Sequence, residues 1–551
     1  MYFEWKDLTL NRSFAYACKN WGARTAIVYG EQHYSYARLQ REVFALSQGL
    51  RELGVQKGTR IAYLLTNGAD WACFLYAAFN LGAIAVPLNL TWVGREIEQG
   101  LHLTDAEILV TVDELRGKCL TDIIQDQFPE LRDSDGERVR IERLPHLRRI
   151  VTLSASGKRY KFAADFNQIK ALGQNFNASE MLALGEQVEP DDLCSFMLTS
   201  GSTAFPKPAI HTHNSILFNV ANIADCHEIQ ADDRILHFAP TYHVAGVEIF
   251  LLPHLRGAAI YLLDFFDPEW AMRTIEREKI SVMWGFDVHY LMMKRHPRYA
   301  LYDISSLERA LIGNSPGTYD EIKSMGIAHH GNIYGSTENG GAHAHFPYRH
   351  RNDEKRKKNS NGMPLSYMET KIVDPQTGER VGVDEIGEIC SRGPGLFKGY
   401  YNMPEETAAA MDQEGFYHSG DYGWLDEKGY IYYRGRIKDT VKTGGENVPA
   451  REVEVILEGE TPWVNTAVVF GVPDAQWGEA VTAMVELKDG SSVSELELRN
   501  YCKNLMAGYK IPKRFLFVKP TDWIITPTGK FDKKALREKA LAMLAINETG
   551  D

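Results

Sequence analysis

Two patterns of hydrophobic positions alternate along the first two thirds of the chain. Short apolar runs of strand length occur at residues 59–65, 83–87, 107–112 and 234–238, and stretches with helical spacing separate them. Runs of this kind, bounded by turn residues, are typical of strands buried in a sheet. The alternation therefore predicts α/β layers with largely parallel sheets.

The pattern changes near residue 362, where Pro and Gly come at short intervals. Brief strand-like runs lie between them at residues 370–373 and 388–390, which predicts a small antiparallel barrel or ribbon. A compact α+β unit of about 110 residues follows residue 439. In this unit we expect helices at residues 452–458 and 495–506 and strands at residues 466–470 and 480–487.

One apolar stretch has the length of a membrane span. Residues 71–92 contain no charged side chain, but Asn80, Gly82 and Pro87 interrupt them. We expect a buried helix that ends near Gly82, then a strand at residues 83–86, and no integral membrane segment. The N-terminus carries charges where a signal peptide would be apolar, so a cytoplasmic location is expected.

Composition narrows the class of protein. A chain of 551 residues exceeds what one core usually supports, so at least two domains are expected. The formal net charge is -12, from 61 Lys and Arg against 73 Asp and Glu, which disfavours nucleic acid as a partner. The seven cysteines include no CxxC pair, which indicates reduced thiols in a cytosol.

The most informative segment is TSGSTAFPK at residues 199–207, which follows the strand-like run 193–198. Such a turn can point backbone N–H groups and hydroxyls at an anion, and Lys207 adds a cation for phosphates. The Walker pattern GxxxxGK[ST] is absent. Taken alone, the segment could equally be a Ser/Thr-rich surface turn.

Further motifs share an order with this segment. They are YGSTE at 334–338, SGD at 419–421, GRIKD at 435–439, KTGGENV at 442–448, GVPD at 471–474 and PTGK at 527–530. Together they resemble the motifs of the acyl-adenylate-forming superfamily, in its acid–CoA ligase branch. The resemblance implies an N-terminal adenylation domain, residues 1–435, with layered α/β subdomains and a small β-barrel-like region. It also implies a mobile C-terminal α+β lid, residues 436–551, with a hinge near Lys438.

The resemblance implies formation of acyl-AMP from an acid and ATP, followed by transfer to coenzyme A. Another acceptor, such as a carrier protein or an oxidative step, is the alternative. Glu338 would hold Mg²⁺, and Asp421 would accept both ribose hydroxyls. The implied nucleotide contacts are Thr199, Ser200, Gly201, Ser202, Thr203, Lys207, Asn314, Ser315, Asn332, Tyr334, Gly335, Asp421 and Arg436.

Four residues are expected to act on the reacting groups: Lys530, Lys438, Thr337 and His243. His243 aligns with an aspartate that binds the substrate amino group in peptide synthetases, so an α-amino acid is not the expected substrate. An apolar acyl pocket is implied from Tyr242, Gly246, Val247, Trp284, Phe286 and Gly340, and CoA contacts from Lys442, Gly444 and Gly445. A homodimer is left open.

Several features compete with this interpretation. Ala204 and Pro208 stand where the family has more flexible residues, which leaves open a catalytically dead adenylate-binding module. Residues 313–317 match GxSxG of serine hydrolases, but Pro316 lacks the N–H that an oxyanion hole needs. The pairs His211/His213 and His343/His345 lack further ligands at zinc-like spacing.

Overall fold

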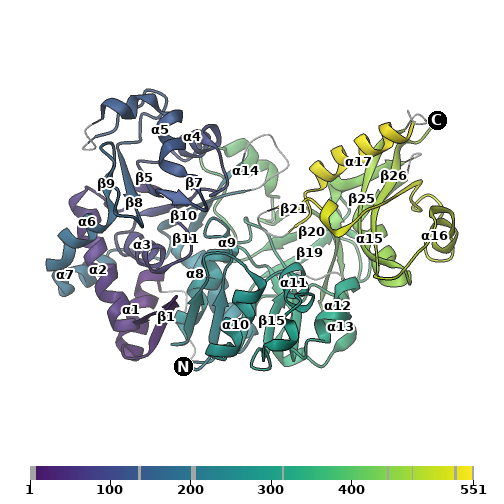
Figure 1. Cartoon of the computed structure of the whole chain (residues 1–551), viewed down its shortest axis with the longest axis horizontal. Coiled ribbons are helices and arrows are strands. Elements are labelled where there is room, and N and C mark those ends of the chain that lie inside the picture. The colour runs from purple at the N-terminus through teal and green to yellow at the C-terminus, as the bar shows by residue number, and fades with distance from the viewer. Residues whose placement is uncertain are drawn as a thin grey trace.

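The computed structural model describes residues 8–134, 138–199, 206–312, 316–443, 446–474, 476–526 and 530–548. Two mainly parallel sheets and their helices make up the larger part of the molecule. A small antiparallel sheet lies between this part and the C-terminal unit, which forms the yellow end of the long axis (Figure 1).

The larger sheet has nine strands in the order β18-β17-β16-β15-β14-β12-β13-β1-β2. Strands β1 and β12 to β16 pair in parallel, and antiparallel pairs close both edges. The strand bounds are β1 Thr25–Tyr29, β2 Gln32–Ser35, β12 Arg234–His237, β13 Ala259–Leu262, β14 Val282–Trp284, β15 Arg309–Ile312, β16 His329–Tyr334, β17 Ala344–His345 and β18 Met363–Pro364.

The second sheet has seven strands in the order β11-β10-β4-β3-β5-β8-β9. All its pairs are parallel except β10–β11, which are joined through the TSGSTAFPK segment. The bounds are β3 Arg60–Leu64, β4 Ile84–Pro87, β5 Ile108–Val112, β8 Arg149–Leu153, β9 Ala164–Asp165, β10 Leu193–Leu198 and β11 Pro208–Thr212. A two-stranded ribbon, β6 Glu114–Leu115 and β7 Lys118–Cys119, follows β5.

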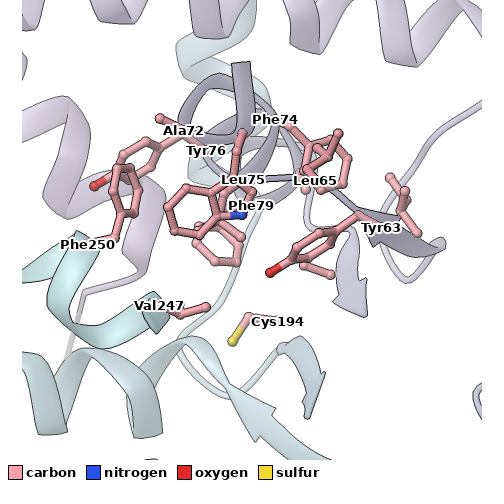
Figure 2. Packing of buried hydrophobic residues seen from close by; sticks show 14 of the residues in the cluster. Tyr63, Leu65, Ala72, Phe74, Leu75, Tyr76, Phe79, Cys194, Val247 and Phe250 are labelled. Atoms are coloured by element: carbon pink, nitrogen blue, oxygen red, sulfur yellow. The ribbon is translucent and has the colours of Figure 1, made fainter. Parts of the chain in front are cut away.

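Helix α3, Ala69–Asn80, lies at the centre of the hydrophobic core and is buried on nearly every side. Figure 2 shows Phe74, Tyr76 and Phe79 of α3 among side chains that come from β3 and from helix α9, Val244–Leu251. A helix enclosed by other elements needs apolar residues all round, whereas a surface helix needs them on one face. The burial of α3 therefore accounts for the uncharged stretch at residues 71–92, and a membrane span is not needed to explain it.

The other helices cover the two sheets. Helices α1, α2 and α7 pack around α3 and one another, and α6 packs on α2, while α10, α11 and β14 share a second buried cluster. The bounds are α1 Leu10–Trp21, α2 Tyr36–Glu52, α4 Gly94–Leu103, α5 Leu120–Gln127, α6 Phe166–Leu172, α7 Ala178–Glu186, α8 His213–Cys226, α10 Pro268–Glu278, α11 Asp287–Lys294, α12 Pro316–Lys323, α13 Glu354–Asn359 and α14 Pro404–Ala410.

The remaining two sheets are smaller. One is antiparallel, in the order β19-β20-β21-β22, with bounds Glu369–Val373, Gly387–Arg392, Tyr417–Leu425 and Ile431–Arg436. The C-terminal sheet contains β23 Thr440–Thr443, β24 Glu446–Pro449, β25 Val464–Asp474, β26 Gly478–Leu487 and β27 Arg514–Phe517. Its helices are α15 Ala450–Glu460, α16 Glu495–Cys502 and α17 Lys533–Glu548.

The predicted elements agree with this architecture. The run at 193–198 is β10, and those at 59–65, 107–112 and 234–238 are β3, β5 and β12 with slightly shorter ends. The α/β layers, the small antiparallel region and the C-terminal α+β unit are all confirmed. Within the described part of the chain, no helix is both long and apolar enough to cross a bilayer.

Candidate active site

The predicted site residues gather where parallel strands of the nine-stranded sheet end. Tyr334 is the last residue of β16, Trp284 ends β14, and His243 follows β12 as the N-cap of α9. Loops that leave the carboxyl ends of parallel strands share one edge of the sheet, which is where ligands bind in α/β proteins. The fold therefore brings together segments far apart in sequence.

The loop after β16, residues 335–341, is held from three directions. His211 Nε2 on β11 lies 2.9 Å from the carbonyl oxygen of Thr337. Asn219 Nδ2 on α8 donates to the carbonyl of Asn339 at 2.7 Å, and Ser391 Oγ donates to Asn339 Oδ1 at 2.8 Å. These buried contacts position Thr337 and Glu338.

Asp421 is buried at the centre of the site, on β21 beside β22. Tyr334 Oη donates to its Oδ2 at 2.8 Å, and Arg436 Nε lies 2.9 Å from Oδ1 as an ion pair. Burial raises the pKa of Asp421 to about 6, and the Arg436 guanidinium acts against that shift. Oδ1 accepts no hydrogen bond of regular geometry from the described residues, so it can still bind a ligand hydroxyl.

The part of β21 that directly precedes Asp421 is held by contacts on the opposite face of the strand. Glu388 Oε1 accepts from the Gly420 backbone N–H at 2.9 Å, and Glu388 Oε2 lies 2.8 Å from His418 Nδ1. Cys390 Sγ is 3.5 Å from the same imidazole nitrogen. Because side chains alternate along a strand, this cluster and Asp421 occupy opposite faces of β21.

Glu338 carries a carboxylate at the mouth of the site. Tyr400 Oη donates to Glu338 Oε1 at 2.7 Å, and Lys207 Nζ lies 5.0 Å from the centre of the Tyr400 ring. A half-buried carboxylate, a phenol and an ammonium are thus grouped at the end of the TSGSTAFPK segment. Hard oxygen ligands of this kind suit Mg²⁺, and the ammonium suits phosphate oxygens.

Lys530 reaches the same place from the C-terminal unit. Its Nζ is 5.6 Å from the centre of the Phe286 ring, at the N-cap of α11. The side chain is exposed to water, but the surrounding protein and the Arg436 charge lower the pKa of Lys530 below its usual 10.5. Burial and the Lys530 charge lower the pKa of His243 to about 4, so this imidazole is neutral at pH 7.

The TSGSTAFPK segment begins and ends in regular pairing. The Thr199 backbone N–H donates to the Lys207 carbonyl at 3.0 Å, and Thr199 Oγ1 accepts from the Lys207 N–H at 3.2 Å. Pro208 opens β11, an edge strand, where a missing N–H costs no ladder hydrogen bond. Outside the described residues lie Ser200, Gly201, Ser202, Thr203, Ala204, Asn314, Ser315, Gly444 and Gly445.

Some of the residues expected around the acyl group pack into the hydrophobic core, and the others lie beside His243 or in closely packed turns. Val247 points into the hydrophobic core beside Cys194 (Figure 2), and Trp284 packs edgewise on His345 with ring centres 5.2 Å apart. Tyr242 lies against His243 with ring centres 5.1 Å apart. Gly246 is packed closely on the Pro240 carbonyl, and Gly340 has a left-handed φ of 69°.

The other predicted residues have varied positions. Asn332 is buried in β16, and Gly335 begins the loop after it, where any Cβ would overlap the Gly341 carbonyl. Lys438 lies in the short turn Ile437–Asp439 between β22 and β23, which belong to different sheets. Lys442 is exposed on β23, and its N–H donates to Glu479 Oε2 at 2.9 Å.

Sequence reasoning missed two residues that organise the site. Tyr400 links the Glu338 carboxylate to the region of Lys207, and His211 holds the Thr337 carbonyl. In the sequence, His211 is distinguished only as half of an HxH pair. No motif identified Tyr400, although its place in a turn-rich segment after Gly399 is compatible with a ligand-facing loop.

The chain belongs to the AMP-binding enzyme family. The family model matches residues 14–401, and the model of the AMP-binding enzyme C-terminal domain matches residues 452–530. YngI of Bacillus subtilis strain 168, which is named as an acyl-CoA synthetase, is 32% identical over 98% of each chain. A feruloyl-CoA synthase of an Amycolatopsis species is 32% identical over 94% of this chain and 96% of its own.

A solved structure gives the same fold. ATP-bound MatB from Rhodopseudomonas palustris superposes with a TM-score of 0.81 at 26% identity, over 97% of this chain and 99% of that one. The likeness covers the two parallel-centred sheets, the small β region and the C-terminal unit together. The mixed α/β architecture with a large N-terminal and a smaller C-terminal domain is therefore that of the family.

Proposed function

We propose that the protein activates a carboxylic acid with ATP as an acyl-adenylate and then transfers the acyl group to coenzyme A. The observation that carries this proposal is the convergence of Lys530 on Asp421 and Arg436 in the adenylate-forming fold. The first half-reaction needs a carboxylate that binds the ribose and mobile cations that bind the phosphates. Relatives named as acyl-CoA synthetase and feruloyl-CoA synthase support CoA as the acceptor.

In the first half-reaction a carboxylate oxygen attacks the α-phosphorus, a new P–O bond forms, and pyrophosphate leaves. Negative charge grows on the oxygens around phosphorus, and the Lys530 ammonium stabilises it electrostatically. Asp421 accepts hydrogen bonds from the ribose hydroxyls through Oδ1, and Arg436 orients that carboxylate. Thr337 then donates to the α-phosphate or the acid.

Magnesium is part of the proposal through Glu338. The carboxylate fits a hard cation because it is half-buried and its orientation is set by the Tyr400 hydroxyl. The bound ion would neutralise phosphate charge. Lys207 lies on the same side and would contact the outer phosphates.

We further propose the division into residues 1–435 and 436–551, with rotation about Lys438 between the half-reactions. The position of Lys438 between two separate sheets supports a hinge, because few residues would have to change conformation. Lys442, Gly444 and Gly445 would then line the route of the CoA thiol. A homodimer remains a proposal, as does a cytoplasmic location, with which seven free thiols agree.

The acid is proposed to carry an uncharged acyl or aryl group of medium size. His243 is neutral and next to the site, where it would not select an α-ammonium group. The test is exchange of labelled pyrophosphate into ATP with a panel of acids. Exchange that needs both Mg²⁺ and an acid supports adenylation. Ester hydrolysis without ATP, or exchange only with amino acids, would contradict the proposal.

A further inference from the structure

Glu388, Cys390 and His418 bring three metal-ligand side chains of different types together on the small antiparallel sheet. Glu388 and Cys390 are two positions apart on β20, and His418 is the cross-strand partner of Cys390 on β21. One ligand atom from each of the three lies within 4.8 Å of the other two. The proposed reaction uses none of these side chains to bind the acid or ATP, so the cluster requires a separate explanation.

The carboxylate and the thiol both face the same nitrogen of the imidazole. Glu388 Oε2 lies 2.8 Å and Cys390 Sγ lies 3.5 Å from His418 Nδ1. In a catalytic triad the acid and the nucleophile contact opposite ring nitrogens, so that the histidine can take a proton from the nucleophile. Cys390 is also fully buried, which keeps its sulfur away from a substrate. The arrangement therefore fits three ligands around one point, and it does not fit a nucleophile with its base.

The distances within the cluster fit a tetrahedral zinc ion. Zinc binds sulfur at about 2.3 Å and imidazole nitrogen at about 2.0–2.1 Å, so neighbouring ligand atoms are about 3.3–3.7 Å apart. The 3.5 Å between Cys390 Sγ and His418 Nδ1 is already of this size. The 2.8 Å contact of Glu388 would lengthen by roughly 0.5 Å when an ion replaces the hydrogen bond. A thiolate and an imidazole favour zinc over magnesium, which prefers oxygen ligands.

The other side of the His418 ring has the partner that a metal-bound histidine needs. Its Nε2 lies 3.6 Å from Asp412 Oδ2. Asp412 is held in place because its Oδ1 accepts from the backbone N–H groups of Glu414 and Phe416, each at 2.9 Å. With a metal on Nδ1, the imidazole carries its proton on Nε2 and donates to Asp412. Metal-ligating histidines almost always have a carboxylate, a carbonyl or a water in this position.

We propose that Cys390, His418 and Glu388 bind one Zn²⁺ ion, with a water molecule as the fourth ligand. The partly exposed His418 gives the ion a path from solvent. Cys390 releases its thiol proton to water as the Zn–S bond forms, and the thiolate and the carboxylate together balance the charge of the ion. The ion ties β20 to β21 behind Asp421, where Glu388 Oε1 accepts from the Gly420 N–H at 2.9 Å. This site does not depend on the proposed function.

The test is metal binding by the purified, tag-free full chain after treatment with a chelator. Co²⁺ serves as the spectroscopic probe, because a cobalt–thiolate bond gives a charge-transfer absorption in the near ultraviolet. We expect one equivalent of Co²⁺ to produce this absorption, Zn²⁺ to displace it, and excess Mg²⁺ to leave it unchanged. Zn²⁺ should also raise the melting temperature, because it binds the folded state. Absence of the cobalt–thiolate absorption in the wild type would overturn the inference.

Cys390→Ser and His418→Gln test the assigned ligands. Each should weaken Zn²⁺ binding by about tenfold or more, and Cys390→Ser should abolish the charge-transfer absorption. Cys119→Ser is the matched control, because Cys119 is a partly exposed thiol outside the cluster, and this variant should bind as the wild type does. Wild-type binding in Cys390→Ser, or loss of binding in Cys119→Ser, would assign the metal to other groups and overturn the inference. If circular dichroism shows that Cys390→Ser does not fold, His418→Gln and the wild-type spectrum decide the outcome.

Discussion

At the scale of single residues, the site is a balance of buried charges around Asp421. Burial raises the pKa of its carboxyl, and the Arg436 charge offsets part of that rise. Tyr334 adds a hydrogen bond to the ionised form. The carboxylate is therefore held close to its titration point, and its ability to accept ribose hydroxyls depends on pH.

Asp421 predicts a pH dependence of ATP binding. With a pKa of about 6, the carboxyl gains a proton as the pH falls through 6 and loses acceptor capacity. The KM for ATP should therefore rise as the pH is lowered from 7 to 5. Asp421→Asn should show a high KM with little dependence on pH in that range. A wild-type KM that is flat with pH would exclude this role.

Lys530 makes a second prediction at this scale. Lys530→Ala should slow adenylation about 10²–10³-fold, because a cation aimed at the transition state is lost. Thioester formation from supplied acyl-AMP should be less affected. Because the pKa of Lys530 is lowered, the ammonium loses its proton as the pH is raised, and wild-type adenylation should decline with a midpoint below pH 10.5. Lys530→Arg should lack this decline, because its guanidinium stays charged. Equal loss in both half-reactions would point to misfolding.

At the scale of elements, the loop after β16 depends on contacts from β11, α8 and β20. His211 is a buried neutral imidazole with a pKa lowered to about 4, so Nε2 can donate to the Thr337 carbonyl at neutral pH. The loop does not form a regular element that would fix its own carbonyls. The geometry of Thr337 and Glu338 is thus imposed by tertiary contacts.

This predicts a role for His211 in catalysis through position. His211→Ala removes a buried donor and leaves a cavity. The Thr337 carbonyl is then unpaired, which should lower the free energy of unfolding by on the order of 1–3 kcal/mol. We expect kcat for adenylation to drop at least tenfold, and His211→Gln to recover part of it. Normal kcat in His211→Ala, with only a lower melting temperature, would assign this histidine to stability alone.

Elements with a strong local pattern were predictable from the sequence, and contacts between them were not. Helix α3 and strand β10 follow from apolar runs and bounding glycines. Motif resemblance named Asp421, Lys530 and Glu338, and the structure brings them to one place. Tyr400 was not predictable because its partner Glu338 is distant in sequence, and a tyrosine alone carries no periodic signal.

At the scale of the whole molecule, the C-terminal unit holds Lys530 against the N-terminal part, next to Phe286. This arrangement suits the first half-reaction. Transfer to CoA needs a route for the thiol to the same carbonyl, so we expect the unit to rotate about the short turn that contains Lys438.

Lys438→Pro tests the rotation. Proline fixes φ near −65° and removes an N–H, which should trap one orientation. Pyrophosphate exchange should persist, while CoA thioester formation should fall by an order of magnitude or more. Gly444→Leu should give the same pattern if that position adjoins the thiol route. Wild-type transfer rates in both variants would show that two orientations are not needed.

The central claim is tested most directly by the products of a complete reaction. Purified protein is incubated with ATP, Mg²⁺, CoA and an aryl or medium-chain acid, and all products are quantified by mass spectrometry. The account predicts acyl-CoA, AMP and pyrophosphate in equal amounts, with acyl-AMP accumulating when CoA is omitted. ADP and phosphate as products, or acyl-CoA formed without AMP, would contradict it.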